Sequence, residues 1–238
     1  MTQPATDNPC KSCPTRTLCL ASGLEENALD SLAECVKPSA PLQKGRHLYR
    51  EGNRADRCYV VRSGVFKTSA MTPAGDEYVT GFHYPGELLG VTGQATGRHA
   101  DSAVALETST ACRVRLDDMA TLWEIGGGTS LMRMLGQAEK KAAGSQINLG
   151  QVRADARVAG YLLQLSRKQQ QIGRDKRILH TPMSRTDLAN FLGMTLESLS
   201  RVMGRFSKAG LVTSGLGEIV IERPDDLQAL ALHMPASD

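Results

Sequence analysis

Three cysteines near the start of the chain are spaced as ligands of a metal ion or cluster. Cys10, Cys13 and Cys19 form a C-x2-C-x5-C motif in a polar stretch of sequence. Thiolates are soft ligands, and sets of four hold either structural zinc or an iron–sulfur cluster. Because no His, Asp or Glu lies between the three, the fourth ligand has to come from a later cysteine.

The later cysteines, Cys35, Cys58 and Cys112, are isolated from one another, and the residues alone leave all three open as the fourth ligand. Six cysteines in 238 residues are too few for a disulfide-stapled secreted scaffold. The first residues are polar and lack a secretion signal, so we expect a soluble, cytoplasmic protein with reduced thiols. No run of about 18 apolar residues is present, so no membrane partner is expected.

A catalytic role for these thiols is not expected. A redox-active C-x-x-C dithiol normally lies beside a βαβ unit, and the sequence predicts none here. The five histidines are scattered, and no set of nucleophile, base and orienting group can be recognised. The sequence therefore favours a binding protein over an enzyme.

A second informative segment lies towards the other end of the chain. Residues 184–195 predict a short helix with Ser184 as its N-cap and a turn through Gly193. Residues 196–206 predict a second helix, and residues 211–222 a β-hairpin. This order is typical of a winged helix-turn-helix, in which the second helix meets the base edges of double-stranded DNA.

The charge of the chain is distributed unevenly. The net charge of +3 is too small by itself to indicate a nucleic-acid partner. Residues 153–208, however, carry eleven basic residues against four acidic ones, a local excess of seven. Such a concentration suits phosphate binding, although a solvated helical face would look the same on charge alone.

Between these two segments the sequence predicts a small antiparallel barrel or roll. A short amphipathic helix is expected over residues 24–36, followed by several β-prone stretches separated by turn signals. The expected strands are residues 47–50, 58–61, 65–68, 78–82, 102–106 and 111–114.

A long helix is expected over residues 129–152, after a break at the glycines of positions 126–128. Apolar and small residues follow one another at alternating intervals of four and three, which is a heptad seam. The seam consists of Leu131, Leu135, Ala138, Ala142, Ser145, Leu149 and Val152. Either the helix packs on its own domain or two copies pair along this seam. With Ala, Ala and Ser at its centre, such pairing buries little area and is weak enough for a ligand to switch.

Taken together, these residues resemble the Crp/Fnr superfamily of bacterial transcription regulators, and most closely its oxygen-sensing Fnr type. The resemblance extends over roughly residues 10–225. The matching motifs are the cysteine trio, Gly75-Asp76-Glu77, Thr80-Gly81-Phe82-His83, Gly86-Glu87-Leu88, the stretch from Leu106 to Cys112, and Glu197-Ser198-Leu199-Ser200-Arg201.

The resemblance implies a homodimeric activator of anaerobic metabolism that binds one 4Fe-4S cluster per subunit and is loosened by oxygen. Cys112 is then the fourth cluster ligand. The implied partners are RNA polymerase and a DNA palindrome resembling TTGAT-N4-ATCAA. In such a site Arg201 can contact guanine, Glu197 can accept from the cytosine amino group, and Ser200 can contact a neighbouring base edge or thymine methyl.

Another possibility is a Crp-like regulator that binds a nucleotide or other small effector in the roll and has structural cysteines, with zinc as the alternative metal. Nucleotide-binding members carry an Arg-Ser pair about ten residues after Gly-Glu-Leu, whereas this loop reads Gly97-Arg98-His99-Ala100-Asp101-Ser102, which disfavours nucleotide control.

The expected fold is therefore α+β, with an amino-terminal β-roll of the cyclic-nucleotide-binding type. Four segments are expected: a cysteine-rich segment (1–23), the β-roll (24–117), a dimerisation helix (118–152) and a winged helix-turn-helix (153–238).

Overall fold

The computed structural model describes residues 8–151 and 153–232, which divide into two compact units. The first unit comprises the chain up to residue 70 together with residues 82–138. The second comprises residues 71–81 together with the chain from residue 139 onward. The architecture is α+β, as expected from the sequence.

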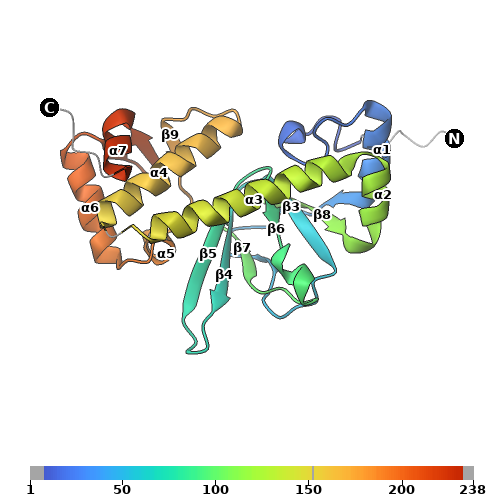
Figure 1. The fold of residues 1–238 in the computed structure, drawn as a ribbon, viewed down its shortest axis with the longest axis horizontal. Helices are drawn as coiled ribbons and strands as arrows, with labels where there is room; N and C mark the ends of the chain where they lie inside the picture. Colours follow the sequence, from blue (N-terminus) through green and yellow to red (C-terminus); the bar gives the residue numbers. More distant parts are fainter. Residues whose placement is uncertain (1–7, 152, 233–238) are drawn as a thin grey trace. The chain divides into compact units, whose positions relative to one another are not determined.

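The roll is built from two four-stranded antiparallel sheets, ordered β1-β8-β3-β6 and β2-β7-β4-β5 (Figure 1). All six predicted strands are present, and two short strands, β1 and β6, were not predicted. The strands are β1 (Val36–Pro38), β2 (His47–Tyr49), β3 (Arg57–Ser63), β4 (Phe66–Met71), β5 (Glu77–His83), β6 (Leu88–Leu89), β7 (Ser102–Ala105) and β8 (Thr110–Arg115).

Strand β3 separates two apolar cores because successive side chains of a strand point to opposite faces. Tyr59 and Val61 join a core with residues of the other sheet, including Phe66. Cys58 and Val60 join a second core on the opposite face. The β1-β8-β3-β6 sheet is therefore covered on both faces.

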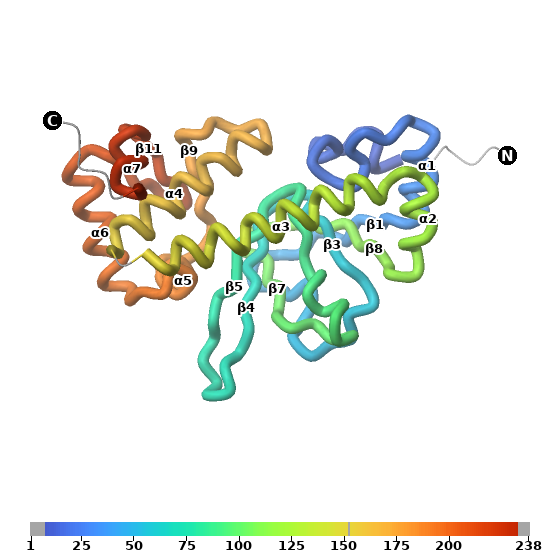
Figure 2. The backbone as a smooth tube through the Cα atoms, viewed as in Figure 1, coloured from blue at the N-terminus to red at the C-terminus, as the bar shows by residue number. Residues whose placement is uncertain are grey.

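Helices and short 3₁₀ turns complete the first unit around this second core (Figure 2). The helix expected over residues 129–152 begins two residues earlier, at Gly127, and ends at Leu149. It can begin earlier because, of the three glycines at positions 126–128, only Gly126 has a non-helical backbone, with a φ of +85°. The elements are η1 (Arg16–Leu18), α1 (Glu26–Cys35), η2 (Thr92–Ala95), η3 (Leu116–Asp118), α2 (Met119–Glu124) and α3 (Gly127–Leu149), of which residues 139–149 belong to the second unit.

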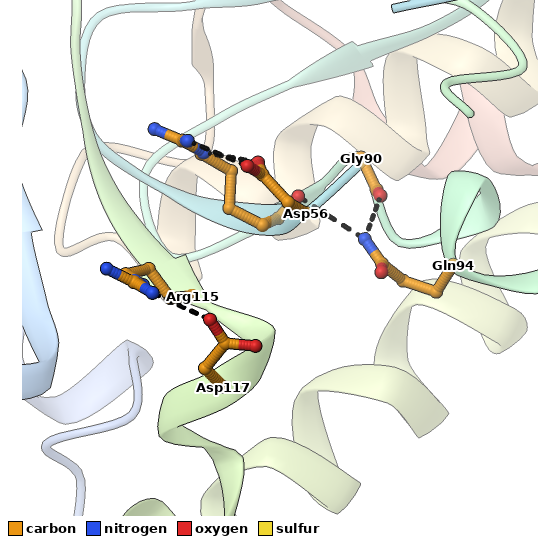
Figure 3. Close-up of polar contacts among 6 residues, drawn as sticks. Asp56, Gly90, Gln94, Arg115 and Asp117 are labelled. Atoms are coloured by element: carbon orange, nitrogen blue, oxygen red, sulfur yellow. Dashed lines mark hydrogen bonds and ion pairs between the residues drawn. The ribbon is translucent and has the colours of Figure 1, made fainter. Parts of the chain in front are cut away.

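The loop between β6 and β7 is fixed to the first sheet by side-chain contacts. Gln94 donates from its amide nitrogen to the carbonyls of Arg57 and Gly90, at 3.3 and 3.2 Å (Figure 3). Two ion pairs, Asp56 with Arg57 and Arg115 with Asp117, flank the neighbouring ends of β3 and β8. These ion pairs are partly or largely exposed, so their contribution to stability is small.

The interior of the roll holds an aromatic stack. His99 is only 3% exposed, and its ring stacks on Tyr49 with centroids 3.9 Å apart. The Tyr49 hydroxyl donates to Asp101 at 2.9 Å. Arg98, in contrast, points to the backbone and donates to the Gly52 carbonyl at 2.7 Å. The side chains of Arg98, His99 and Asp101 in the 97–102 loop are therefore held by contacts with the roll itself.

The second unit contains a three-stranded sheet and four further helices. The sheet is ordered β10-β11-β9. The predicted helix pair and the predicted hairpin are present, whereas β9 and α7 were not predicted. The elements are α4 (Ala154–Gln171), β9 (Ile178–His180), α5 (Arg185–Phe191), α6 (Leu196–Lys208), β10 (Val212–Ser214), β11 (Glu218–Ile221) and α7 (Pro224–Ala231).

Both helices of the helix-turn-helix begin at a side-chain cap. The Ser184 hydroxyl accepts from the Asp187 amide at 2.9 Å, and the Thr195 hydroxyl accepts from the Ser198 amide at 3.1 Å. Gly193 turns the chain between them with a φ of +61°. These local signals explain why this part of the fold could be predicted from sequence.

No helix within residues 8–151 and 153–232 has the length and apolar character needed to cross a membrane.

A close approach at Gly86 predicts a stability effect. Gly86 has a φ of +85°, and a Cβ atom there would lie 2.6 Å from the Cβ of Leu18. Gly45 has a similar φ of +81° but open space around it. Both changes to alanine carry a backbone strain of about 1–2 kcal/mol, and Gly86→Ala carries a further overpacking cost of about 1–3 kcal/mol.

Urea unfolding of the two variants measures the difference. Gly86→Ala should lower the free energy of unfolding more than Gly45→Ala does. Equal losses in the two variants would show that Leu18 does not constrain this turn.

Candidate metal centre and nucleic-acid interface

The four cysteines expected as ligands all line one cavity in the first unit. Cys10, Cys13, Cys19 and Cys112 share its wall with apolar side chains and Arg62. Cys35 and Cys58 are buried and are absent from that wall. The cavity thus brings together the same four residues that the resemblance implied.

Strand register places Cys112 at the cavity. On β8 it lies opposite Val60 of β3 and opposite Pro38 of β1. It therefore points to the same face of the sheet as Val60, which is the face covered by the cysteine segment. Cys58 is on that face too, but it lies opposite Val114, two pairs further along the ladder.

The cysteine segment is held in place by short hydrogen bonds. The Asn8 side chain accepts from the Cys10 amide at 2.8 Å and donates to the Leu29 carbonyl of α1 at 2.9 Å. The Cys13 sulfur and the Thr15 hydroxyl oxygen lie 3.1 Å apart, and Thr15 is buried. The Cys19 thiol donates to the Arg16 carbonyl at 3.5 Å.

Burial, with repulsion between the thiols added to it, raises the pKa of three of the cysteines above the ordinary value for a thiol. Burial is the main cause that raises the pKa of Cys112 to about 12, with repulsion from the neighbouring cysteines added to it. Burial also raises the pKa of Cys10 and of Cys19. A site of this kind gives up protons when a cation binds, because only the thiolates are ligands.

Three basic side chains that were not predicted from the sequence oppose this effect. Arg62 lowers the pKa of Cys10 and Cys112, although less than burial raises them. Lys37 acts similarly on Cys10, and Arg133 on Cys19. The period of two along β3, which puts Arg62 on the face of Val60, is the sequence signal that could have found it.

The thiols share a cavity without forming a site for a single ion. Among residues 8–151 and 153–232, no group of three or more His, Cys, Asp or Glu side chains is placed to hold one metal ion. A zinc ion would require four sulfur atoms at about 2.3 Å from one point. Any group bound by all four thiols therefore has to fit the distances between their sulfur atoms.

The three expected base-reading residues lie together on the outer side of α6. Glu197, Ser200 and Arg201 are all exposed, whereas Leu199 and Val202 are buried beneath them. The Arg201 guanidinium donates to the Glu197 carboxylate at 3.0 Å. The arginine is thereby oriented by its partner one turn earlier, and the pair forms a donor and acceptor surface of the kind that reads base edges.

Further basic residues surround this surface. Arg205 and Lys208 lie in the last turn of α6 and are exposed. Arg185, at the start of α5, donates to the Ser214 hydroxyl of the hairpin at 3.4 Å. Leu216 is fully exposed between β10 and β11. This arrangement places basic side chains, which can contact phosphates, around the helix expected to meet the bases.

The expected dimer seam lies on α3, and its members have different surroundings. Leu131 and Leu135 are half-buried against the core that also contains Met134. Ala138 and Ala142 are exposed, and Ser145 and Leu149 are half-buried. Val152 lies outside the described residues.

The large apolar side chains of α3 that are exposed lie elsewhere. They are Met132, at 57% exposure, and Ile147, at 70%. Ile147 is about 140° around the helix from Ala142, since each residue turns an α-helix by about 100°. The helix therefore presents a second apolar side, well separated from the expected seam.

Two family descriptions match the chain. Residues 40–125 match a cyclic nucleotide-binding domain, and residues 156–230 match a Crp-like helix-turn-helix domain.

Similar proteins extend this match to nearly the whole chain. The fumarate and nitrate reduction regulatory protein of Salmonella typhi is 35% identical over 229 residues, which is 94% of this chain and 90% of that protein. The transcriptional activator protein Anr of Pseudomonas protegens is 37% identical over 226 residues, which is 93% of this chain and 92% of that protein.

A solved structure agrees in fold. FixK2 from Bradyrhizobium japonicum is 24% identical with a TM-score of 0.72, covering 85% of this chain and 99% of that one. With two domain matches and relatives of this similarity over nearly its full length, the chain belongs to the Crp/Fnr family of transcription regulators.

Proposed function

We propose that this protein is an oxygen-responsive transcription regulator that binds DNA as a homodimer when a 4Fe-4S cluster is bound. The observation that carries the proposal is the single cavity lined by Cys10, Cys13, Cys19 and Cys112. The names of the relatives, which refer to fumarate and nitrate reduction and to transcriptional activation, support it.

The donor set fits a 4Fe-4S cluster. All four donors are thiols, and among the described residues no carboxylate or imidazole lines the cavity. A 4Fe-4S cluster takes one thiolate on each iron. Four thiolates can also hold structural zinc, so the iron and sulfide content decides between the two.

A bound cluster would supply an oxygen-sensitive iron centre. The positions of its ligands in the chain determine which parts of the protein are disconnected when the cluster is lost. The ligands on the cysteine segment and on β8 are far apart in sequence, so the bound group links the segment to the sheet. Without the group, burial favours the neutral thiols, and this link is lost. Oxygen thus changes the attachment of the cysteine segment.

The surface of α6 is proposed to read a palindrome resembling TTGAT-N4-ATCAA, from which RNA polymerase would then be activated. The Arg201 guanidinium can bind guanine O6 and N7, and the Glu197 carboxylate can accept from the cytosine amino group. The Ser200 hydroxyl lies on the same exposed side. Two copies of the helix in a homodimer would address the two half-sites.

A nucleotide effector in the roll is not favoured by the structure. His99 and Tyr49 stack in its interior, and Arg98 is engaged with the Gly52 carbonyl. His99 and Arg98 belong to the loop in which nucleotide-binding relatives place their Arg-Ser pair.

Replacing cysteines tests the metal centre. The full chain purified without oxygen should contain iron and acid-labile sulfide and should lose its colour in air. Cys112→Ala should abolish iron and sulfide binding, because it removes a ligand. Cys58→Ala, a buried cysteine of the same core outside the cavity wall, should retain both. A colourless protein with one zinc per chain would instead establish the structural-metal alternative.

Base reading is tested with two basic residues of the same helix. Arg201→Ala should weaken binding to the palindrome by about 1–3 kcal/mol for each bidentate guanine pair that it removes, mainly at sites that keep the guanine. Lys208→Ala should weaken binding to all sequences alike, because it removes a cation that faces a phosphate. Fluorescence anisotropy with specific and random duplexes measures both. If Arg201→Ala weakens specific and random DNA equally, Arg201 reads no base.

Charge on α3 tests the dimer seam. Ala142→Glu should raise the dimer dissociation constant at least tenfold in anaerobic sedimentation experiments, because two like charges would meet at the seam. Gln137→Glu, on another side of the helix, should change it little. If Ile147→Glu weakens the dimer and Ala142→Glu does not, the copies pair along the Met132 and Ile147 side instead.

A further inference from the structure

A short loop connects the cysteine motif to α3 through hydrogen bonds. The Ser130 hydroxyl of α3 donates to the Ser22 carbonyl at 2.7 Å. One nitrogen of the Arg133 guanidinium donates to the Ser22 hydroxyl at 3.0 Å, and the other to the Cys19 carbonyl at 3.5 Å. We call Ser22, Ser130 and Arg133 the Ser22 clasp. It joins both ends of the loop from residue 19 to residue 22 to one turn of the long helix.

The packing around the clasp makes this connection stiff. Leu20 and Ala21, between the two anchored residues, are 2% and 1% exposed and lie in the same core as Met134 of α3. Cys19 and Cys112 also pack against that core. A change in the position of Cys19 therefore meets well-packed side chains of α3 rather than solvent.

Ser130 and Arg133 form hydrogen bonds that depend on the position of the loop backbone. Ser130 is only 5% exposed, so its hydroxyl needs a partner inside the protein, and the Ser22 carbonyl is that partner. The guanidinium of Arg133 is a rigid planar fork, which holds two acceptors only while they keep their spacing. The hydrogen bonds of both residues break if the backbone from Cys19 to Ser22 shifts.

We infer that Ser130 and Arg133 are positioning residues that couple ligation at Cys19 to the pairing of α3. This inference rests on the function proposed above. With Cys19 ligated, the loop is fixed and the clasp holds the turn of α3 that carries Leu131 and Leu135, the first two seam residues. When ligation ends, the loop is released, the clasp opens and this turn loses its support. Because such coupling is reciprocal, pairing of α3 also stabilises ligation.

Dimerisation of matched variants tests the clasp. The quantity measured is the ratio of dimer dissociation constants, cluster-free over cluster-loaded, determined by anaerobic sedimentation on the full chain. Wild type should give a ratio of at least ten. The Ser130→Ala/Arg133→Gln double variant, loaded to the wild-type content of iron and sulfide, should give a ratio near one. Lys140→Gln, which removes another exposed cation of α3 outside the clasp, should keep the wild-type ratio.

Arg133→Lys separates geometry from charge. It keeps the cation but loses the planar fork, so its ratio should fall below that of wild type. A wild-type ratio in this variant, or in the double variant, overturns the clasp and leaves the proposed function intact. A wild-type protein that binds no cluster, or whose dimer ignores it, overturns the proposed function and the clasp with it. If the double variant cannot be loaded, Ser130→Ala/Arg133→Lys, which keeps the cation beside Cys19, replaces it, and a wild-type ratio in that variant overturns the clasp.

Discussion

The confinement of four thiols in one apolar cavity is the constraint on which the first unit depends. Burial, with repulsion between the thiols, raises the pKa of Cys10, Cys19 and Cys112, and the neighbouring cations Arg62, Lys37 and Arg133 reduce this rise without reversing it. The thiols become good ligands only when a strongly cationic group compensates their charge. Binding of that group, release of protons and attachment of the cysteine segment are therefore one linked event.

The β1-β8-β3-β6 sheet makes this confinement possible. One of its faces packs on the second sheet of the roll, while the other carries Cys112 and the core beneath the cysteine segment. The segment can approach closely because Gly86 has no side chain to meet Leu18. The stack of Tyr49 and His99 fills the inner side of the roll. The roll thus uses its outer face, rather than its interior, for the site with the most evident chemistry.

Local signals in the sequence were sufficient to predict the helix-turn-helix and the cysteine trio, but not the fourth cysteine of the cavity. The helix-turn-helix could be predicted because its caps, its turn glycine and its apolar period all lie within about 25 residues of one another. Cys10, Cys13 and Cys19 could be recognised by spacing. The choice of Cys112 over Cys35 and Cys58 could not be made from the residues alone, because it depends on which residues pair across β1, β3 and β8, and register is a long-range property. The resemblance to a family supplied what the pattern could not.

The same limit explains the two faces of α3. A heptad pattern shows which residues share a side of a helix but not what that side meets. In the structure, Leu131 and Leu135 are partly buried against the core of their own unit, while Ala138 and Ala142 are exposed. Pairing along this seam then gains little additional apolar burial, so its free energy is small. A coupling of only about 1–3 kcal/mol is enough to shift such an equilibrium by several-fold to a hundredfold. Under the proposed function, the residues that would make the seam weak are thus the ones that would let a local change at the thiols control assembly.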